Sequence, residues 1–276
     1  MEDEAVEEIE MRLLLEALRQ RYGYEFHHYA AASLRRRIGQ FMSQRGIQHI
    51  SQIIPQALYD REFLRGLVNS FSVPVTEMFR DPAVFVVLRE KVVPILKTYP
   101  FVTIWHAGCS TGEEVYSLAI VLHEENLLER CHIFATDFNE DSLSKAKAGV
   151  FALEKMKEFT ENYLKAQGRA SFSDYYHAKY QFAKMRDFLN RNIIFAAHNL
   201  STDSVFIHPQ LIMCRNVLIY FDEVLQNRVL TLFCESLDRG GILCLGRHET
   251  LRFSDVEKSF QPLSAEERIF RKMLAC

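Results

Sequence analysis

The segment Trp105–Glu114, WHAGCSTGEE, places a turn of small residues directly before two acidic residues. An apolar run, FVTIW, leads into it and a helix-like run follows, which predicts a strand, a tight turn and the start of a helix. Backbone N–H groups at such a junction can bind an anionic group of a ligand. The next apolar run, HIFATD, ends at Asp137, whose carboxylate could accept hydrogen bonds from ribose hydroxyls. We therefore predict a site for a ligand that carries a ribose.

The acidic residues narrow the choice of ligand. The two glycines of the turn, Gly108 and Gly112, do not form the G-x-G-x-x-G fingerprint of dinucleotide sites. Glu113 and Glu114 would also repel a pyrophosphate group. A zwitterionic amino-acid group fits better, because its carboxylate can meet the N–H groups while its ammonium meets a glutamate. A ligand that combines a ribose with a free amino acid is S-adenosylmethionine (AdoMet).

A second polar pair interrupts an apolar run further along the chain. Arg215 and Asn216 lie inside LIMCRNVLIYF, and burying a guanidinium without a partner is costly. Ligands bind at strand ends in parallel sheets, so we interpret this pair as functional. The histidines show no metal-ligand spacing and are interpreted as ordinary polar or packed residues. The six cysteines form no C-x-x-C pair and are interpreted as reduced, mostly buried thiols, so no metal is expected.

The elements that would position these residues follow from the patterning. From Phe101 onward, apolar strand-like runs alternate with helical patterns, which predicts a mostly parallel α/β sheet with helices on both faces. The final runs, in SFQPLSAEERIFRKML, predict an antiparallel edge hairpin. The stretch of about 151–191 is longer than a simple crossover needs and predicts an inserted helix and small sheet, with its aromatic residues as core. We expect a helical domain over residues 1–75 and the α/β domain over residues 76–276.

Two helices of the first hundred residues are predicted in more detail. The first helix is predicted from an apolar stripe at helical spacing, which consists of Val6, Ile9, Leu13 and Ala17, widened by Leu14 and Leu18. Further along, DPAVFVVLREKVVPIL predicts a helix with Asp81 as N-cap and Pro82 as its first residue.

The composition is that of an ordinary globular protein: of 276 residues, 48% are hydrophobic and 25% charged, with a net charge of −3. The apolar runs are shorter than the roughly 18 residues of a membrane-spanning helix, and the acidic start MEDEAVEEIE does not resemble a signal peptide. The mild acidity gives no overall signal for nucleic-acid binding. We therefore expect a cytoplasmic monomer that neither inserts into a membrane nor binds nucleic acid.

Charge is nevertheless uneven. The stretch from Phe26 to Tyr59 contains no acidic residue, and its basic residues include Arg35, Arg36, Arg37 and Arg45. Such a segment is either an ordinary solvated helix face or a docking surface for an acidic partner.

Five motifs occur along the chain in a fixed order: SVPVTEMFRD, GCSTGEEVYSLAI, ATDFNEDSLSKAKAGVF, AAHNL and CRNVLIYFD. As an ordered set they resemble the chemotaxis receptor methyltransferases, the CheR family, over essentially the whole chain. The resemblance implies a helical domain, a class I AdoMet-dependent methyltransferase (Rossmann-like) sheet and an inserted β-subdomain. The implied activity is transfer of a methyl group from AdoMet to the γ-carboxylate of glutamates on the cytoplasmic helices of bacterial chemoreceptors. S-adenosylhomocysteine would be the other product.

The resemblance also implies roles for individual residues. Thr76 and Arg80 match the T-x-F-F-R motif that closes over the cofactor, with Met78 in place of the first Phe. Glu114 matches the acid that faces the methionyl end, and Asp137 the acid on the ribose.

The remaining matches lie in the second half of the chain. Asn199 and Leu200 match the pair beside the adenine, and Arg215 and Asn216 match the family's R-N pair. Tyr220 matches the tyrosine near the methyl group and, with Arg80, would be catalytic. Many members carry a polar residue where this chain has Pro74, so a cofactor contact there is limited to the backbone carbonyl or to packing.

The implied chemistry needs no general base, because a glutamate side chain with a pKa of about 4.3 is ionised at neutral pH. The absence of the N/D-P-P-Y sequence of amino-group methyltransferases agrees with this. The alternative function is a non-catalytic AdoMet-sensing or scaffold protein that docks to receptors. A nucleic-acid or small-molecule methyltransferase is disfavoured by the acidity and the missing N/D-P-P-Y, and a dehydrogenase by the missing fingerprint.

Overall fold

The computed structural model describes residues 2–71 and 76–273. Contacts divide the chain into two compact units: Met1–Val73 together with Ile219–Arg228, and Pro74–Leu218 together with Val229–Cys276. The grouping of residues 219–228 with the N-terminal residues is a feature that no pattern in the sequence indicates. Pro74 lies outside the described residues.

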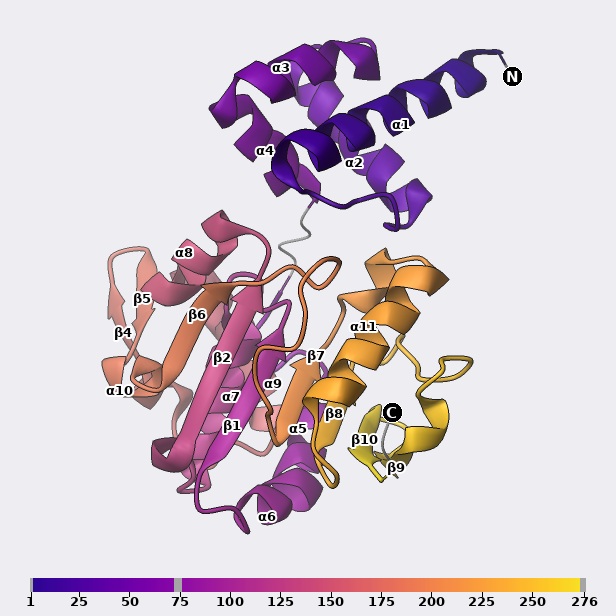
Figure 1. The fold of residues 1–276 in the computed structure, drawn as a ribbon. Helices are drawn as coiled ribbons and strands as arrows, with labels where there is room; N and C mark the ends of the chain where they lie inside the picture. The colour runs from indigo at the N-terminus through magenta and orange to yellow at the C-terminus, as the bar shows by residue number, and fades with distance from the viewer. Residues whose placement is uncertain (1, 72–75, 274–276) are drawn as a thin grey trace. The chain divides into compact units, whose positions relative to one another are not determined.

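A seven-stranded sheet in the order β6-β2-β1-β7-β8-β10-β9 forms the centre of the larger unit (Figure 1). Its strands are β1 (Val102–Ala107), β2 (Cys131–Asp137), β6 (Ile193–Ala197), β7 (Leu211–Cys214), β8 (Ile242–Leu245), β9 (Phe260–Ser264) and β10 (Ile269–Lys272). The first five pair in parallel, whereas β10 runs antiparallel to both β8 and β9. The predicted parallel α/β sheet with an antiparallel C-terminal hairpin is therefore confirmed.

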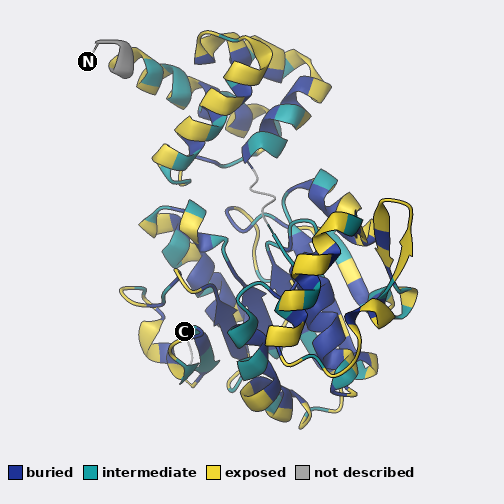
Figure 2. Cartoon of the chain, turned by 180° about the vertical axis from the view of Figure 1, so that it is seen from behind, coloured by how far each residue is buried: buried dark blue, intermediate teal, exposed yellow. Residues whose placement is uncertain are grey.

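Helices cover both faces of this sheet (Figure 1). They are α5 (Pro82–Val87), α6 (Val93–Leu96), α7 (Glu113–Glu124), α8 (Glu140–Ala148), α9 (Met156–Lys165), α10 (Asp187–Asn190) and α11 (Glu223–Ser236). Because both faces are covered, β7 and β8 are apolar throughout, and every residue of these two strands is buried (Figure 2). Trp105 on β1 is fully buried and meets Phe233 of α11 edge-on, with ring centroids 5.3 Å apart.

The predicted helix DPAVFVVLREKVVPIL forms, but not as one regular α-helix. The segment Leu88–Val92 between α5 and α6 is a π-helix. Pro94, which follows it, has no N–H, and its ring would clash with the carbonyl four residues earlier in a regular α-helix. A local widening of the helix relieves that clash.

The inserted segment carries a three-stranded sheet in the order β3-β5-β4, built from β3 (Val150–Ala152), β4 (Tyr176–Lys179) and β5 (Phe182–Met185). The small antiparallel sheet predicted from the sequence is therefore present. The prediction that its aromatic residues form a core is only partly right. Tyr175 is buried, whereas Tyr180 and Phe182 are exposed.

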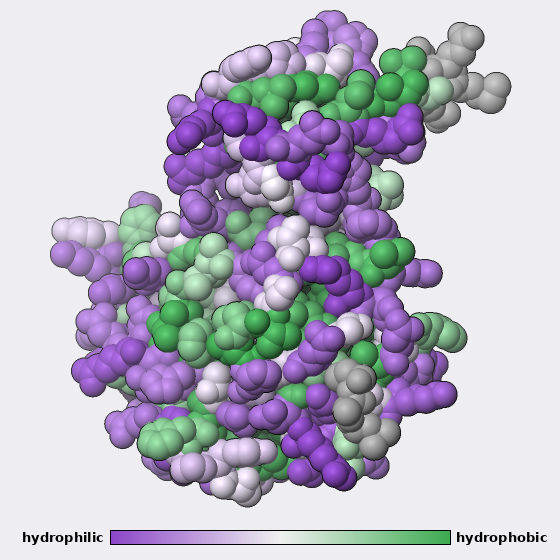
Figure 3. Space-filling view, viewed as in Figure 1, coloured by the Kyte–Doolittle hydropathy of each residue, from purple (hydrophilic) through white to green (hydrophobic). Residues whose placement is uncertain are grey.

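The smaller unit contains α1 (Glu2–Tyr22), α2 (Ala31–Arg45), α3 (Ile53–Tyr59) and α4 (Arg61–Phe71). On α1, Leu14 and Leu18 are buried, but Val6, Ile9 and Leu13 are about half exposed and form an apolar row along the helix (Figure 3). The helix predicted from the apolar stripe is therefore confirmed, and only the part of the stripe that contains Leu14 and Leu18 enters the core.

Within the described part of the chain, no helix is long and apolar enough to cross a membrane. Cys109, Cys131, Cys214 and Cys244 are buried free thiols, as expected. Cys234 is disulfide-bonded, so the expectation of reduced thiols is wrong at that position.

Candidate active site

The turn after β1 and the carboxyl end of β2 are joined through Asp137. Its two carboxylate oxygens accept hydrogen bonds from the backbone N–H groups of Ser110, at 2.8 Å, and of Asn139, at 2.9 Å. These bonds fasten the turn to the end of β2; they do not cap the next helix, α8, whose N-cap is Asn139. A carboxylate has about four lone-pair sites, so Asp137 keeps the capacity to accept a further hydrogen bond. Asp137 can therefore hold the turn and a ribose at the same time.

The two glycines of the turn are required by packing within the protein. Both have left-handed backbone angles, with φ of 71° at Gly108 and 92° at Gly112. A Cβ at Gly108 would lie 2.4 Å from Val217, and a Cβ at Gly112 would lie 2.9 Å from Ala146. The turn therefore packs closely against the segment after β7 on one side and against α8 on the other.

Fewer N–H groups of the turn face a ligand than the sequence suggested. The N–H of Cys109 donates to the carbonyl of Thr136, that of Ser110 to Asp137, and that of Gly112 to the carbonyl of Cys109. These donors are used to build the turn itself.

Glu114 and Arg215 form the charged centre of the site. Arg215 has a side chain with no exposed surface, and it contacts the carboxylate of Glu114 through Nη1 and that of Asp81 through Nη2, at 2.7 Å. Burial alone would raise the pKa of Glu114, but the Arg215 guanidinium and the neighbouring His106 lower it to about 2. Two carboxylates thus share one guanidinium, which leaves the cluster with an excess negative charge suited to a cationic group of a ligand.

Two residues of this site were missed by the sequence reasoning. His106, interpreted as an ordinary histidine, places Nε2 3.1 Å from Glu114, while its buried Nδ1 has no hydrogen-bond partner in the described ranges. Glu249 accepts hydrogen bonds from the N–H groups of Val217 and Leu218, both at 2.8 Å. It fixes the turn that carries Arg215. His106 had the same signal as Arg215, a polar side chain at the end of an apolar run.

The turn before α5 brings Arg80 and Asp81 to the same cluster. Phe79 and Asp81 adopt left-handed backbone angles, with φ of 54° and 52°, which for residues other than glycine costs about 1 kcal/mol or more each. The turn is held from two sides, because Phe79 N–H donates to Ser117 Oγ at 2.9 Å and Arg215 Nη1 donates to the Arg80 carbonyl at 3.2 Å. Asp81 occupies the predicted N-cap position, but its side chain makes no capping bond and pairs with Arg215 instead.

The end of β6 lies beside Asp137. The N–H of His198 donates to the Asp137 carbonyl at 3.1 Å, so Asn199 and Leu200 leave the sheet next to the predicted ribose site. The side chain of Asn199 accepts a hydrogen bond from Ser201 N–H, and Leu200 is buried.

The remaining predicted site residues are placed differently. Asn216 is half-buried and has a left-handed φ of 59° directly after Arg215. Thr76 is half-buried at the start of the described segment before α5. Tyr220 belongs to the segment that groups with the smaller unit, where the Arg37 guanidinium lies 5.7 Å from its ring.

The strand order, the antiparallel hairpin and a site built at the ends of β1, β2 and β7 define a class I AdoMet-dependent methyltransferase. Comparison with protein families agrees: residues 74–269 match the family described as "CheR methyltransferase, SAM binding domain", and residues 9–72 match "CheR methyltransferase, all-alpha domain". The chain belongs to the CheR family and is an AdoMet-dependent methyltransferase. Over the described residues, no group of three or more metal-ligating side chains is placed to hold an ion.

Individual relatives fit the same family. The chain is 48% identical over 272 residues to "Putative methyltransferase Cher3" of Pseudomonas putida, covering 99% of this chain and 100% of that protein. It is 29% identical to "Chemotaxis protein methyltransferase" of Listeria innocua, covering 83% and 85%. Among solved structures, SAM-bound CalS10 from Micromonospora echinaspora aligns with a TM-score of 0.36 and 12% identity, over 62% of this chain and 52% of that one.

The residues present fit AdoMet. The excess negative charge around Arg215, the unpartnered Nδ1 of His106 and the spare acceptor capacity of Asp137 together match a ligand with a cationic centre and ribose hydroxyls.

Replacing Asp137 with alanine should weaken AdoMet binding by about 1.5–3 kcal/mol, the usual contribution of hydrogen bonds to a charged group. Burial raises the pKa of Asp137, although its backbone hydrogen bonds oppose the shift. If Asp137 holds the ribose, the ribose hydroxyls donate to the ionised carboxylate, and AdoMet affinity should decline on acidification at a higher pH than the pKa of about 3.9 of an ordinary aspartate. Calorimetry at several pH values measures both effects. The AdoMet affinity of Asp137→Asn should not decline in this way on acidification, because an amide does not titrate. Unchanged affinity with reduced thermal stability would mean that Asp137 only holds the turn in place.

Proposed function

We propose that this protein transfers the methyl group of AdoMet to the γ-carboxylate of glutamate residues on the cytoplasmic helices of chemoreceptors, as part of adaptation in chemotaxis. Family membership over nearly the whole chain is the observation that carries the proposal. The name of the Listeria innocua relative, a chemotaxis protein methyltransferase, supports the chemotactic role. The protein would act in the cytoplasm, as a monomer.

The site supports an acceptor that is already ionised. AdoMet supplies a methyl group activated by its sulfonium, so the protein must orient the two reactants in line rather than remove a proton. Such alignment can contribute roughly 7–11 kcal/mol to lowering a barrier. The carboxylates that meet Arg215 are ion-paired, and the Arg215 and His106 side chains lower the pKa of Glu114 to about 2 despite its burial, so Glu114 is no proton acceptor at neutral pH.

The residue roles follow the family pattern. Asp137 would hold the ribose, Asn199 and Leu200 the adenine, and Glu114 the methionyl ammonium. Arg80 and Tyr220 would orient the acceptor carboxylate. Thr76, Arg215 and Asn216 would complete the cofactor site by fixing the residues around the cofactor. The contacts of Arg215 with two acids support this role.

The basic segment Phe26–Tyr59 is proposed as a receptor-docking surface, but with fewer available charges than its sequence suggests. Arg35 forms ion pairs with Glu7 and Glu8 of α1, at 3.2 and 3.0 Å. Acids from another helix therefore compensate Arg35, although the segment itself contains none.

The other arginines also differ from one another in their surroundings. Arg37 is half-buried and donates to the Ser70 carbonyl, while Arg45 lies over the rings of Phe41 and Phe63. Arg36 is exposed, which makes it the best candidate for contact with an acidic partner.

Arg36→Glu should raise KM for the receptor and leave AdoMet affinity unchanged, because it reverses an exposed charge on α2. Added salt should lower the wild-type rate, since the Debye length falls to about 8–10 Å at physiological ionic strength. Initial rates at several receptor and salt concentrations measure this. Arg35→Glu is the matched comparison: it should also reduce the stability of the helical unit, since it opposes Glu7 and Glu8. Normal receptor methylation by Arg36→Glu at all salt concentrations would place docking elsewhere.

The substrate is tested by incubating the protein with labelled AdoMet and receptor-containing membranes. Label on the receptor that base releases as methanol is the expected result, because carboxyl methyl esters are base-labile. Base-stable label would point to a different acceptor group. AdoMet binding without any transfer would favour the alternative, an AdoMet-sensing or scaffold protein.

A further inference from the structure

Helix α9 of the inserted segment runs along the motif that precedes α5, and contacts three consecutive residues of it. Burial raises the pKa of Glu77, and the neighbouring Glu158 carboxylate raises it further. Asn162 Nδ2 donates to the Met78 carbonyl at 3.2 Å, and the ring of Tyr163 meets that of Phe79 edge-on, with centroids 5.2 Å apart. Residues four apart share one face of a helix, so Glu158 and Asn162 meet the motif from the same face of α9, and Tyr163 extends the contact beside Asn162.

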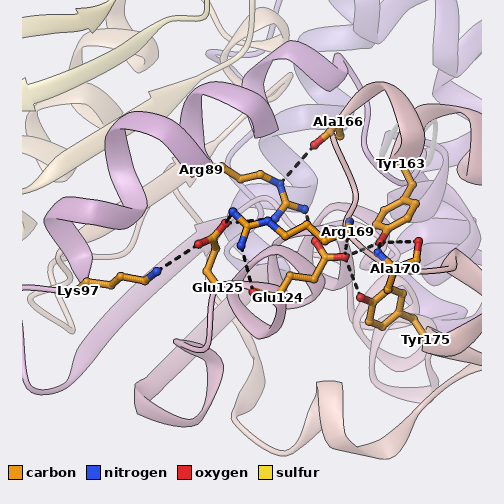
Figure 4. A network of polar contacts seen from close by, with 9 residues as sticks. All are labelled: Arg89, Lys97, Glu124, Glu125, Tyr163, Ala166, Arg169, Ala170 and Tyr175. Carbon is orange, nitrogen blue, oxygen red and sulfur yellow. Dashed lines mark hydrogen bonds and ion pairs between the residues drawn. The ribbon is translucent and has the colours of Figure 1, made fainter.

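The position of Tyr163 is itself fixed from the other side (Figure 4). Its hydroxyl donates to the buried carboxylate of Glu124 and accepts a hydrogen bond from the Ala170 N–H, at 2.9 Å. Glu124 also accepts a hydrogen bond from Tyr175, at 2.8 Å, and pairs with Arg89. Both members of the Arg89–Glu124 pair are almost fully buried.

The network joins the π-helix after α5 to the last residue of α7, and both of these segments lead away from the active site. Arg89 lies in the π-helix that follows α5, and Glu124 is the last residue of α7, the helix that opens with Glu113 and Glu114. Arg89 Nε also donates to the Ala166 carbonyl just after α9, at 3.3 Å. Breaking a buried ion pair is strongly unfavourable, so α9 cannot move along the motif without disturbing this network.

The motif needs such support. Phe79 and Asp81 both hold left-handed backbone angles, and such conformations persist only where the surroundings impose them. On one side the turn is held by Ser117 of α7, through the Phe79 N–H. Asn162 and Tyr163 of α9 supply the other side. Asp81, at the end of this turn, is the residue that meets Arg215.

We propose that Asn162 and Tyr163 are positioning residues for methyl transfer, because they hold the left-handed turn Phe79–Asp81 in the shape that presents Arg80 and Asp81 to the cofactor site. The inserted segment therefore shapes the active site of its own domain. Measuring its effect on the transfer rate rests on the methyl transfer proposed above. The AdoMet affinities of the variants test it without that assumption.

The experiment compares variants of the full chain by AdoMet affinity, transfer rate and thermal stability. Asn162→Asp replaces the donor with a carboxylate that opposes the Met78 carbonyl, and Tyr163→Leu removes the ring from Phe79. Both should weaken AdoMet binding and lower kcat by about tenfold or more, since a 1 Å misplacement can cost roughly 100-fold. KM for the receptor should change little, because neither residue is proposed to contact it.

Two further variants separate positioning from general stability. Tyr175→Phe removes a hydrogen bond to the same carboxylate oxygen of Glu124 as Tyr163 uses, but its ring has no contact with Phe79 among the ring pairs of the described residues. This variant should have a lower thermal stability. Its AdoMet affinity and kcat should stay within about twofold of the wild type, because the turn Phe79–Asp81 is not displaced. Tyr163→Phe keeps the ring and should restore most of the affinity and rate lost in Tyr163→Leu.

The proposal is overturned if Asn162→Asp binds AdoMet and transfers methyl groups like the wild type. It is also overturned if Tyr163→Leu and Tyr175→Phe lose activity in the same proportion as their thermal stability. A wild-type protein that binds AdoMet but methylates no receptor would refute the proposed substrate, while the AdoMet affinities of the variants would still decide the role of α9.

Discussion

Arg215→Ala is expected to destabilise the protein by about 3–5 kcal/mol and to abolish AdoMet binding at ordinary concentrations. The Arg215 side chain is fully buried and joins Glu114, Asp81 and the Arg80 carbonyl. Removing it leaves the buried carboxylate of Glu114 without its cationic partner, which is far more costly than the loss of an exposed pair. Denaturant unfolding measures the stability, and calorimetry the binding.

The pH dependence of this variant provides a second measurement. Although burial alone would raise the pKa of Glu114, Arg215 and His106 lower it from 4.5 to about 2 in the folded protein. A lowered pKa means that the pair stabilises the fold above pH 4.5 and loses this contribution as the pH falls toward about 2. The difference in unfolding free energy between wild type and Arg215→Ala should therefore narrow below pH 4.5.

A surface pair of the same residue types is the control. Arg19 contacts Glu16 at 2.6 Å, and the two side chains are 48% and 37% exposed. Arg19→Ala should cost only a small fraction of the stability lost in Arg215→Ala, as expected of exposed pairs. Equal losses of unfolding free energy in the two variants would mean that the buried Arg215 cluster stabilises the protein no more than an exposed pair does.

Arg80→Ala is expected to reduce methyl transfer by about 100-fold or more, the effect of removing one well-placed donor from a transition state. Arg80 lies between the two left-handed residues of the turn, and its carbonyl is bonded to Arg215. Its side chain is half exposed rather than core, so the fold should survive. Initial rates with labelled AdoMet and thermal unfolding measure the two effects.

Arg80→Lys separates charge from geometry. Lysine keeps the positive charge but lacks the planar fork that binds a carboxylate through two donors. We expect a rate between those of the wild type and Arg80→Ala. Wild-type turnover by Arg80→Ala would reject the assigned role, and a large loss of thermal stability would indicate a structural one.

The predictable part of the fold is the part in which local pattern and tertiary structure agree. Buried strands separated by helices have a rhythm that the sequence displays directly, so the sheet, its hairpin and the ends of β2 and β7 were predicted with Asp137 and Arg215 at strand ends. Periodicity alone could not decide which of two adjacent apolar stripes of α1 faces the core. Leu14 and Leu18 do so, and Val6 does not.

The site was less predictable, because its key contacts join residues far apart in the chain. Asp81 and Arg215 are separated by 134 positions, and the acids that compensate Arg35 lie on a different helix. His106 could have been found by the argument applied to Arg215, since both are polar side chains at the ends of apolar strands. Asp81 was predicted as a cap from its local sequence, and only the tertiary structure shows that its carboxylate turns to Arg215.

The close packing of the two glycines affects how this family can diverge. Any side chain at Gly108 would collide with Val217, and one at Gly112 would collide with Ala146, so both positions are constrained by the fold itself. A descendant that abandoned catalysis but kept its structure would keep these glycines and still match the motif. Arg80, to which we assign a role in methyl transfer, would no longer be selected for that role. Substitution of Arg80 in a chain that retains Gly108 and Gly112 would therefore mark a pseudoenzyme.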